Sequence, residues 1–342
     1  MKIMANKEKA LIIEILTKLG LRKEDAEIVA EATLDADLKG FSSHGIGRFP
    51  QYVNAIKLGN INIEGKIAIE KETDSIALIN GNGLFGQVVA YRAMELAIEK
   101  AKKSGIGAVG THDANHFGVT GFYSDLAIKK DVIGIVTANT DPAMAPLGGK
   151  VAVIGTNPIA IGIPANETYV ALDMATSVSA RGKLLEAKRK GESIPEDIAL
   201  DADGNPTTDP SKALEGSILP FGAHKGYGLA FMIEIITGPL VSAAFGCKVE
   251  GTANYEKKCN KGDFFVAIDP SKFVDINTFK EETEEFIKEI RSSGDTIVPG
   301  DIEVENIAKN EKEGIAMDEN LYEQLKEICD GLNINLDGYL VT

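Results

Sequence analysis

The sequence predicts an α/β (α+β) fold, with a helical N-terminal part followed by a body of alternating strands and helices. Apolar residues recur every three or four positions from Asn6 to about Gly59, which is the period of amphipathic helices. From about Ile67 the chain changes to short runs rich in β-branched residues, separated by glycine turns and helical stretches. This alternation predicts a mixed α/β body with a boundary near residue 74.

The individual elements follow from local patterns. LRKEDAEIVAEATLDADLKG keeps the helical period, and Gly40 stands where a helix would end. Helices are also predicted for AYRAMELAIEKAKKSG, YSDLAIKK, FKEETEEFIKEIRSS and NLYEQLKEICDGL, and strands for SIALIN, GAVGTH, IGIVTAN, PIAIGIP, TYVALDM and DFFVAID. The stretch around IVPGDIEVE predicts irregular structure. The last helix could fold back on the N-terminal helices and make one discontinuous helical domain with them.

One long apolar run, YGLAFMIEIITGPLVSAAFG from 227 to 246, requires a choice between a membrane span and a buried helix. Glu234 interrupts the run, and the Gly238-Pro239 pair should end a helix near Thr237. A charged side chain inside a membrane is costly. The run therefore predicts a buried helix of a protein that does not cross a membrane.

The composition excludes several classes of partner. A formal net charge of −15 would repel nucleic acid and anionic membranes at long range. The N-terminal stretch MKIMANKEKALIIEILTKLG places charges among its apolar positions, so it lacks the continuous apolar core of a signal peptide. The three cysteines have no CxxC spacing, which indicates neither a disulfide framework nor a cysteine zinc site. We expect a cytoplasmic protein with no nucleic-acid or membrane partner.

The segment FSSHGIGRFPQY, residues 41 to 52, combines residue types that carry chemistry. His44 can move a proton near neutral pH, and Arg48 can hold a carboxylate or sulfonate through two parallel hydrogen bonds. Ser43 is placed to orient His44. The spacing predicts a proton carrier and an anion clamp that are fixed relative to each other.

SIALINGNGLFGQ, residues 75 to 87, contains the pattern GxGxxG after a predicted strand and before a predicted helix. This is the context of a Rossmann dinucleotide site. The acidic residue expected about 20 positions later is replaced by Lys102 and Lys103 within the next helix. The incomplete fingerprint favours a tight turn over a cofactor site.

THDANHFGVTG, residues 111 to 121, places His112 and His116 four positions apart. On a helix this spacing would suit zinc, with Asp113 between the two rings. The preceding strand pattern and the following glycines favour a loop instead, and no third ligand is apparent. A hydrolase that uses a histidine-bound metal is therefore a weak alternative. The glycine-rich loop would let the His116 ring lie close to a ligand, and a structural histidine that caps the next helix is the alternative.

Other segments suit a long, flat cofactor. ANTDPAMAPLGGK, IGTNPIAIG and LDMATS each run from a strand into small polar residues, which present backbone N–H groups and hydroxyls. His224 and Lys225 precede a helix, where a positive side chain and the helix dipole favour phosphate. Arg181 in SARGK is a further cation.

These segments together resemble the malate/L-lactate/L-sulfolactate dehydrogenase family, whose members are nicotinamide-dependent oxidoreductases unrelated to the Rossmann-type lactate dehydrogenases. The resemblance covers nearly the whole chain. It is carried, in the family's order, by DADLKGFSSHGIGRFPQYVNAIKLGNIN, ANHFGVTGFYS, GGKVAVIGTNPIAIGIP, LDMATSVSARGK, DADGNPTTDP, LPFGAHKGYGLA and VPGDIE. The first block is most similar to archaeal members that reduce sulfopyruvate, oxaloacetate and related 2-oxoacids.

The resemblance implies a discontinuous helical domain, residues 1–74 with 295–342, and a mixed-sheet, non-Rossmann domain for NAD or NADP, residues 75–294. It also implies a homodimer whose active site lies between the subunits. For catalysis it indicates His44, His116 and Ser43, and for substrate binding Arg48, Arg181 and Asn157. The expected cofactor-binding residues are Thr140, Asp173, Met174, Ala175, Thr176, Ser177, His224, Lys225, Gly300 and Asp301. No metal is expected, and His112 departs from the family pattern.

The reaction implied by the resemblance is hydride transfer between NAD(P)H and C2 of a 2-oxoacid, while His44 or His116 donates a proton. The expected pairs are sulfopyruvate with (R)-sulfolactate and oxaloacetate with (S)-malate, with a place in coenzyme M biosynthesis. Another 2-hydroxy acid, such as lactate, 2-hydroxyglutarate or a ureidoglycolate-like compound, is the alternative. A binding protein without turnover is a further alternative. The residues do not distinguish NAD from NADP.

Overall fold

A computed structural model of the protein describes residues 1–341. Within these residues a seven-stranded sheet has the order β2-β3-β4-β10-β5-β6-β7. Strand β3 runs parallel to β4, and every other neighbouring pair in this sheet is antiparallel. The mixed α/β class is therefore confirmed. The sheet is not the mainly parallel sheet of a Rossmann fold.

The bounds of the elements are as follows. The helices are α1 (Ala5–Lys18), α2 (Lys23–Leu38), α3 (Phe49–Lys57), α4 (Gly86–Ser104), α5 (Gly121–Ile128), α6 (Arg181–Lys190), α7 (Pro210–Glu215), α8 (His224–Thr237), α9 (Ile276–Ser292), α10 (Asp301–Glu313) and α11 (Glu319–Gly331). The strands are β1 (Lys2–Ile3), β2 (Ala68–Glu72), β3 (Ile76–Asn80), β4 (Ile106–His112), β5 (Ile133–Ala138), β6 (Ile159–Ile163), β7 (Val170–Met174), β8 (Ala199–Leu200), β9 (Ser217–Ile218), β10 (Asp263–Ile268) and β11 (Ile315–Ala316). Short 3-10 turns include η1 (Ile46–Arg48), η2 (Pro239–Val241) and η4 (Pro270–Lys272).

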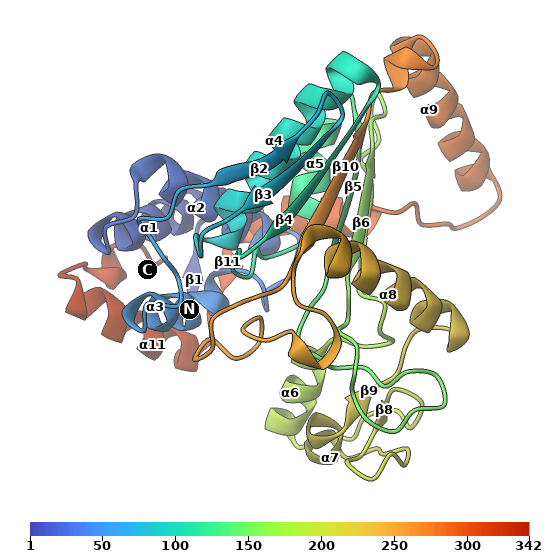
Figure 1. The fold of residues 1–342 in the computed structure, drawn as a ribbon. Coiled ribbons are helices and arrows are strands. Elements are labelled where there is room, and N and C mark those ends of the chain that lie inside the picture. Colours follow the sequence, from blue (N-terminus) through green and yellow to red (C-terminus); the bar gives the residue numbers. More distant parts are fainter. Residues whose placement is uncertain (342) are drawn as a thin grey trace.

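The main core joins the N-terminal helices to the sheet. Helix α4 packs on β4 and β10, α5 packs on β5 and β6, and α2 contacts α4. Figure 1 shows α4 and α5 lying along the long strands, with α6 and α7 in a separate lower lobe. That lobe has a small core of its own, which includes Met144, Ile154, Leu184 and Ile218.

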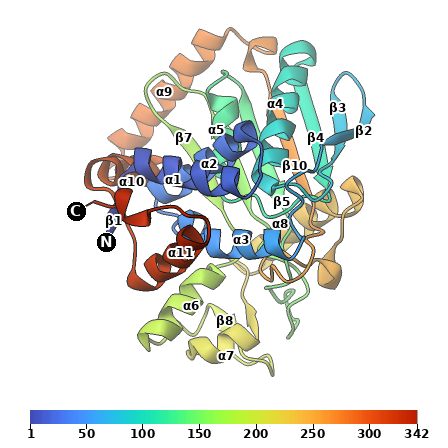
Figure 2. The same ribbon diagram turned by 90° about the vertical axis from the view of Figure 1, so that its left-hand side faces the viewer.

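The two ends of the chain lie together. Strand β1 pairs antiparallel with β11, α10 contacts α2, and α11 contacts α3. Figure 2 shows the red C-terminal helices beside the blue N-terminal ones. Asn310 donates to the backbone oxygens of Asp37 and Leu38 at 3.1 and 3.0 Å. These contacts fit a discontinuous helical domain, although β2, before residue 74, pairs with β3; the domain boundaries stay a prediction.

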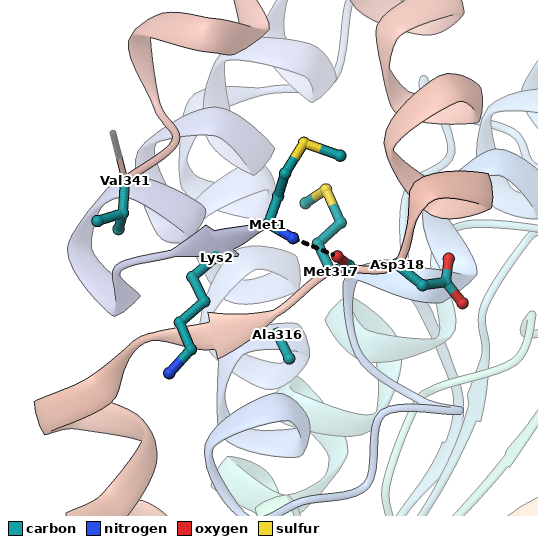
Figure 3. Close-up of a pocket in the computed structure, with 6 residues that line it drawn as sticks. All are labelled: Met1, Lys2, Ala316, Met317, Asp318 and Val341. Carbon is teal, nitrogen blue, oxygen red and sulfur yellow. Dashed lines mark hydrogen bonds between the residues drawn. The ribbon is translucent and has the colours of Figure 1, made fainter.

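A surface hollow lies where the two chain ends meet. It is lined by Met1, Lys2, Ala316, Met317, Asp318 and Val341 (Figure 3). The N-terminal amino group donates to the Met317 oxygen at 3.0 Å, which holds the first residue against the residue that follows β11. None of the predicted site residues lines this hollow.

Two predictions about local structure are wrong. The segment that begins at Asp301 is helical through Glu313, although irregular structure was predicted around IVPGDIEVE; Gly300, with φ of 109°, caps its start. Helix α8 ends at Thr237 as predicted, but it is not buried all round. Phe231 is 44% exposed, Met232 58% and Ile235 45%. Over residues 1–341, the helices are too short or too polar to cross a membrane.

Candidate active site

The segment that carries His44 lies between α2 and α3. The Ser43 hydroxyl is 2.9 Å from Nδ1 of His44, a contact through which Ser43 would orient this ring. The Nε of Arg48 donates to the backbone oxygen of Ser43 at 2.7 Å. The arginine is therefore fixed to the same short segment as the imidazole.

Helix α2 holds this segment in place. Oδ2 of Asp37 accepts the backbone N–H of Ile46 at 2.6 Å in the protein interior. A Cβ atom added to Gly45 would lie 2.0 Å from the Asp37 carboxyl group. The glycine in SSHGIG is thus required by the close approach of a buried carboxyl group, not by an unusual φ angle.

The glycine turn after β3 supports His116. Nδ2 of Asn115 donates to the Gly83 oxygen at 2.7 Å, and a Cβ atom on Gly86 would lie 2.0 Å from the Asn115 oxygen. The GxGxxG glycines therefore allow a second loop to pack on the turn. This explains the pattern without a dinucleotide and agrees with its missing acidic residue.

His44 and His116, distant in sequence, come together in this structure. Their rings stack with centroids 5.5 Å apart and an interplanar angle of 28°. His116 is 9% exposed and His44 is half-buried. His112 is not part of this stacked pair. Its ring instead contacts Glu70 and Asp113 at 3.0 and 3.2 Å. Among residues 1–341 no group of three potential ligands is arranged for a metal ion.

Three aromatic or amide residues that the sequence analysis did not select complete the site. The Tyr52 hydroxyl is 2.9 Å from Nδ1 of His116 and accepts from Nε2 of Gln87 at 3.0 Å. Nη1 of Arg48 donates to the Tyr255 hydroxyl at 3.0 Å. Tyr52 lies one helical turn after Arg48, so the helical spacing of the sequence could have identified Tyr52 as a site residue. Tyr255 lies in an irregular segment that gave no signal.

Burial and positive charge govern the titration of both imidazoles. Burial, followed by the Arg48 charge, lowers the pKa of His44 to about 3. Burial, Arg48, His44 and Lys261 hold the pKa of His116 well below its ordinary value. Both rings are therefore neutral at pH 7 without a ligand, and an anion bound near Arg48 would offset the charge that suppresses their protonation.

Arg181 lies near this site. It is the first residue of α6, and a Cβ atom on Gly182 would lie 3.6 Å from the Cβ of Ser43. Arg181 is exposed, and its Nη2 lies 3.4 Å from the Leu214 oxygen. The fold thus brings the start of α6 to the His44 segment, as a distal anion contact would require.

Asn157 and Thr140 are held in a buried polar cluster. Nδ2 of Asn157 donates to Glu234 at 2.6 Å and to the Ala230 oxygen at 3.0 Å, while its Oδ1 accepts the Thr140 N–H at 3.3 Å. The Asn157 side chain is fully buried. Its geometry gives it a role in positioning strand ends, and direct contact with substrate stays a prediction.

The segment from Asp173 to Ser177 covers the end of β7 and the residues that follow this strand. Oδ2 of Asp173 accepts the Gly121 N–H at 2.7 Å at the start of α5, and burial raises the pKa of Asp173 to about 7. Thr176 donates from its N–H and its hydroxyl to the Thr156 oxygen, both at 2.9 Å. The Ser177 hydroxyl donates to the Ser179 oxygen at 2.8 Å. Met174 and Ala175 lie between these anchors, partly exposed.

Two further predicted cofactor segments lie at helix starts. His224 and Lys225 begin α8 and are both exposed, and no side chain among the described residues caps this helix. An open helix start with an adjacent lysine fits the phosphates of a dinucleotide. At the start of α10, the Asp301 carboxylate is already engaged by the Val298 N–H and by Arg291, both at 2.9 Å. Gly300 packs on the Tyr169 oxygen.

Reduction of a 2-oxoacid requires a proton carrier beside an anion clamp, and this fold provides both at one place, which defines a dehydrogenase of a non-Rossmann class. The chain belongs to the malate/L-lactate dehydrogenase family, whose family model matches residues 3–326. It is 64% identical over 337 residues to the malate/(S)-sulfolactate dehydrogenase of Methanothermus fervidus, covering 98% of this chain and 99% of that protein.

Solved structures agree with this membership. The sulfolactate dehydrogenase of Methanocaldococcus jannaschii superposes with a TM-score of 0.95 at 53% identity, over 99% of both chains. The malate dehydrogenase of Pyrococcus horikoshii OT3 gives a TM-score of 0.90 at 36% identity, over 98% of this chain and 96% of that chain. The prediction of the family is confirmed, and a metal-dependent hydrolase is not favoured.

Proposed function

We propose that the protein is an NAD- or NADP-dependent dehydrogenase that interconverts a 2-oxoacid and a 2-hydroxy acid, with sulfopyruvate or oxaloacetate as the oxoacid. The observation that supports this most strongly is the stacked pair of His44 and His116 beside Arg48. The names of the relatives support the substrate class. The configuration of sulfolactate and a place in coenzyme M biosynthesis stay predictions.

The residues of this chain have distinct roles in the proposed reaction. A bound nicotinamide supplies or takes up the hydride at C2. Arg48 holds the substrate carboxylate, Ser43 orients His44, and His44 or His116 exchanges the proton of the C2 oxygen. Lys225, His224 and the open start of α8 hold phosphate, and the end of β7 lines the cofactor path.

We also propose that the enzyme is a cytoplasmic homodimer with active sites between the subunits. Phe231 and Ile235 are one turn apart on α8, and Met232 lies beside them, so the three form an exposed apolar face. Leu240 of η2 is 61% exposed and Phe245 45%, so further apolar side chains are exposed in the segments that follow α8. An exposed apolar face of this kind is typical of a subunit interface.

The test is the rate of NADH or NADPH oxidation with a panel of 2-oxoacids, measured with and without EDTA. We expect turnover with sulfopyruvate or oxaloacetate that EDTA leaves unchanged, because the predicted site needs no metal. The absence of turnover with every oxoacid and both cofactors would contradict the proposed function. Loss of activity in EDTA with recovery in zinc would favour the metal alternative.

A further inference from the structure

The surroundings of His116 determine which ring nitrogen carries its proton. The backbone N–H of Gly118 points at Nδ1 of His116, with 3.3 Å between the nitrogens. A backbone N–H can only donate, so Nδ1 offers its lone pair at this contact. The contact does not depend on the orientation of a hydroxyl or a side-chain amide. A neutral His116 therefore carries its proton on Nε2.

Tyr52 and Gln87 reinforce this state. With Nε2 of Gln87 donating to the Tyr52 oxygen at 3.0 Å, the hydrogen of the Tyr52 hydroxyl is directed to Nδ1 of His116, 2.9 Å away. Tyr52 is fully buried and Gln87 is 1% exposed. Protonating Nδ1 would oppose the buried Tyr52 hydroxyl and the partly buried Gly118 N–H at once, which is costly where water is largely excluded.

The charges around His116 also oppose a protonated ring. The charged or titratable groups that face it are Arg48, His44, Lys261, Tyr52 and Tyr255. Lys261 is itself paired with Asp263, and its ammonium lies 4.2 Å from the centre of the Phe117 ring. Burial raises the pKa of Tyr52, so its hydroxyl stays protonated and keeps its hydrogen for Nδ1.

His44 has a different partner. Its Nδ1 meets the Ser43 hydroxyl at 2.9 Å, and a hydroxyl can donate or accept. Ser43 can therefore satisfy His44 when the ring is neutral and when it is protonated. His44 is also half-buried, whereas His116 is 9% exposed. Of the two rings, His44 is the one whose surroundings accommodate a change of protonation.

We propose that the two histidines have separate roles: His116 is a neutral donor that hydrogen-bonds the C2 oxygen through Nε2, and His44 transfers the proton. Tyr52 and Gln87 are then positioning residues that fix the tautomer of His116. This division of roles rests on the proposed function. A neutral imidazole can stabilise developing negative charge on oxygen without losing its own proton.

The proposed step balances as follows. In reduction, a bound nicotinamide would supply the hydride to C2, and the electron pair of the C=O π bond would form an O–H bond to the proton that His44 carries once the substrate anion lies near Arg48. Nε2–H of His116 hydrogen-bonds the same oxygen throughout and keeps its proton. His44 is left neutral, and it takes a new proton from solvent when the next substrate anion binds near Arg48 and offsets the charge that lowers the pKa of this ring. Oxidation of the hydroxy acid follows the same steps in reverse.

The tautomer can be measured by NMR on ligand-free protein labelled with ¹⁵N in histidine. The chain has only four histidines, so their signals can be resolved, and His116→Gln identifies the signals of His116. We expect His116 to be neutral with its proton on Nε2 from about pH 6 to 9. A proton on Nδ1, or a ring that becomes protonated in this range, would overturn the inference.

Variants test the positioning role of Tyr52. Tyr52→Phe should shift the tautomer equilibrium of His116 by roughly 2- to 10-fold, the effect of one hydrogen bond, and should lower kcat more than it raises KM. Tyr169→Phe is the matched control for the tautomer, because it removes a partly buried hydroxyl that donates to Asp125 at 2.7 Å instead. Unchanged ¹⁵N shifts in Tyr52→Phe would reject this role.

A second pair of variants separates the two histidines. Glutamine keeps an N–H donor but cannot transfer a proton, so His116→Gln should retain about tenfold more kcat than His116→Ala. His44→Gln should be as slow as His44→Ala. The opposite ranking would overturn the assignment. An inactive wild type would reject the proposed function, whereas the NMR result would still decide the tautomer.

Discussion

The carboxyl group of Asp37 binds the backbone N–H of Ile46 at 2.6 Å, so a buried acidic side chain of α2 holds the segment with His44 and Arg48. Glu8 of α1 faces the same carboxyl group. Both Glu8 oxygens are buried and have no other hydrogen-bond donor among the described residues. Two carboxyl groups can hydrogen-bond only when one carries a proton. We therefore expect the two carboxyl groups to share one proton beneath the catalytic segment.

Gly45→Ala should disrupt this arrangement. The new Cβ atom would lie 2.0 Å from the Asp37 carboxyl group, which cannot move freely because it is buried and hydrogen-bonded. Overpacking of this kind costs about 1–3 kcal/mol of unfolding free energy. Urea unfolding and kcat should both fall in this variant. Gly331→Ala is the control, because within the described structure no atom lies within 4 Å of its new Cβ. Equal behaviour of the two variants would contradict this explanation.

Glu8→Gln should change how stability depends on pH. Burial raises the pKa of Asp37 from 3.8 to about 7, so the folded state keeps a proton that the unfolded chain has released. This contribution to stability is complete below about pH 3.8 and is lost as the pH rises through about 7. His44 acts oppositely, because its lowered pKa makes stability rise with pH from about 3 to 6.5.

Burial also raises the pKa of Glu8, so Glu8 adds to the loss of stability with rising pH; in Glu8→Gln the amide does not titrate, and this part of the trend should disappear while the parts from Asp37 and His44 remain. The urea midpoint of this variant should rise more between pH 5 and 7.5 than the wild-type midpoint does. Glu31→Gln, at an exposed glutamate paired with Lys9, should keep the wild-type trend. Parallel curves for Glu8→Gln and the wild type would show that no proton is shared.

Arg181→Ala should weaken the preference for dianionic substrates. Wild-type kcat/KM for sulfopyruvate or oxaloacetate should exceed that for pyruvate at least roughly tenfold, which about 1.4 kcal/mol of transition-state binding would give. The variant should lose most of this ratio and keep its rate with pyruvate. Arg189→Ala, on the same helix but paired with Asp318 at 2.8 Å, should keep the ratio. A preserved ratio in Arg181→Ala would assign the distal anion to another residue.

Ile235→Glu should dissociate the proposed dimer. A charge at the centre of the exposed apolar face of α8 would have to be buried without a partner in the interface, which is strongly unfavourable. The molar mass from light scattering should fall toward that of one chain, and activity should fall with it. Phe273→Glu, at a 79% exposed residue just after η4, should leave the mass unchanged. A dimeric Ile235→Glu would place the interface elsewhere.

Much of the local structure was determined by the sequence alone. The predicted strand DFFVAID matches β10 (Asp263–Ile268), and NLYEQLKEICDGL matches α11 (Glu319–Gly331). These elements follow from periodicity, which depends only on neighbouring residues. The order along the chain of the segments that resemble the family also identified the family. Single residue types indicated a proton carrier at His44 and an anion clamp at Arg48.

Only the tertiary structure decided which of these groups meet. Strand β10 lies between β4 and β5 although it follows both in the chain, and the His116 ring reaches His44 because the loop after β4 packs on the glycine turn. The hydrogen bonds from Tyr52 and Gln87, and the exposed face of α8, also depend on this packing. Contacts between distant segments are set by how whole elements share one core, and local sequence patterns carry no information about that arrangement.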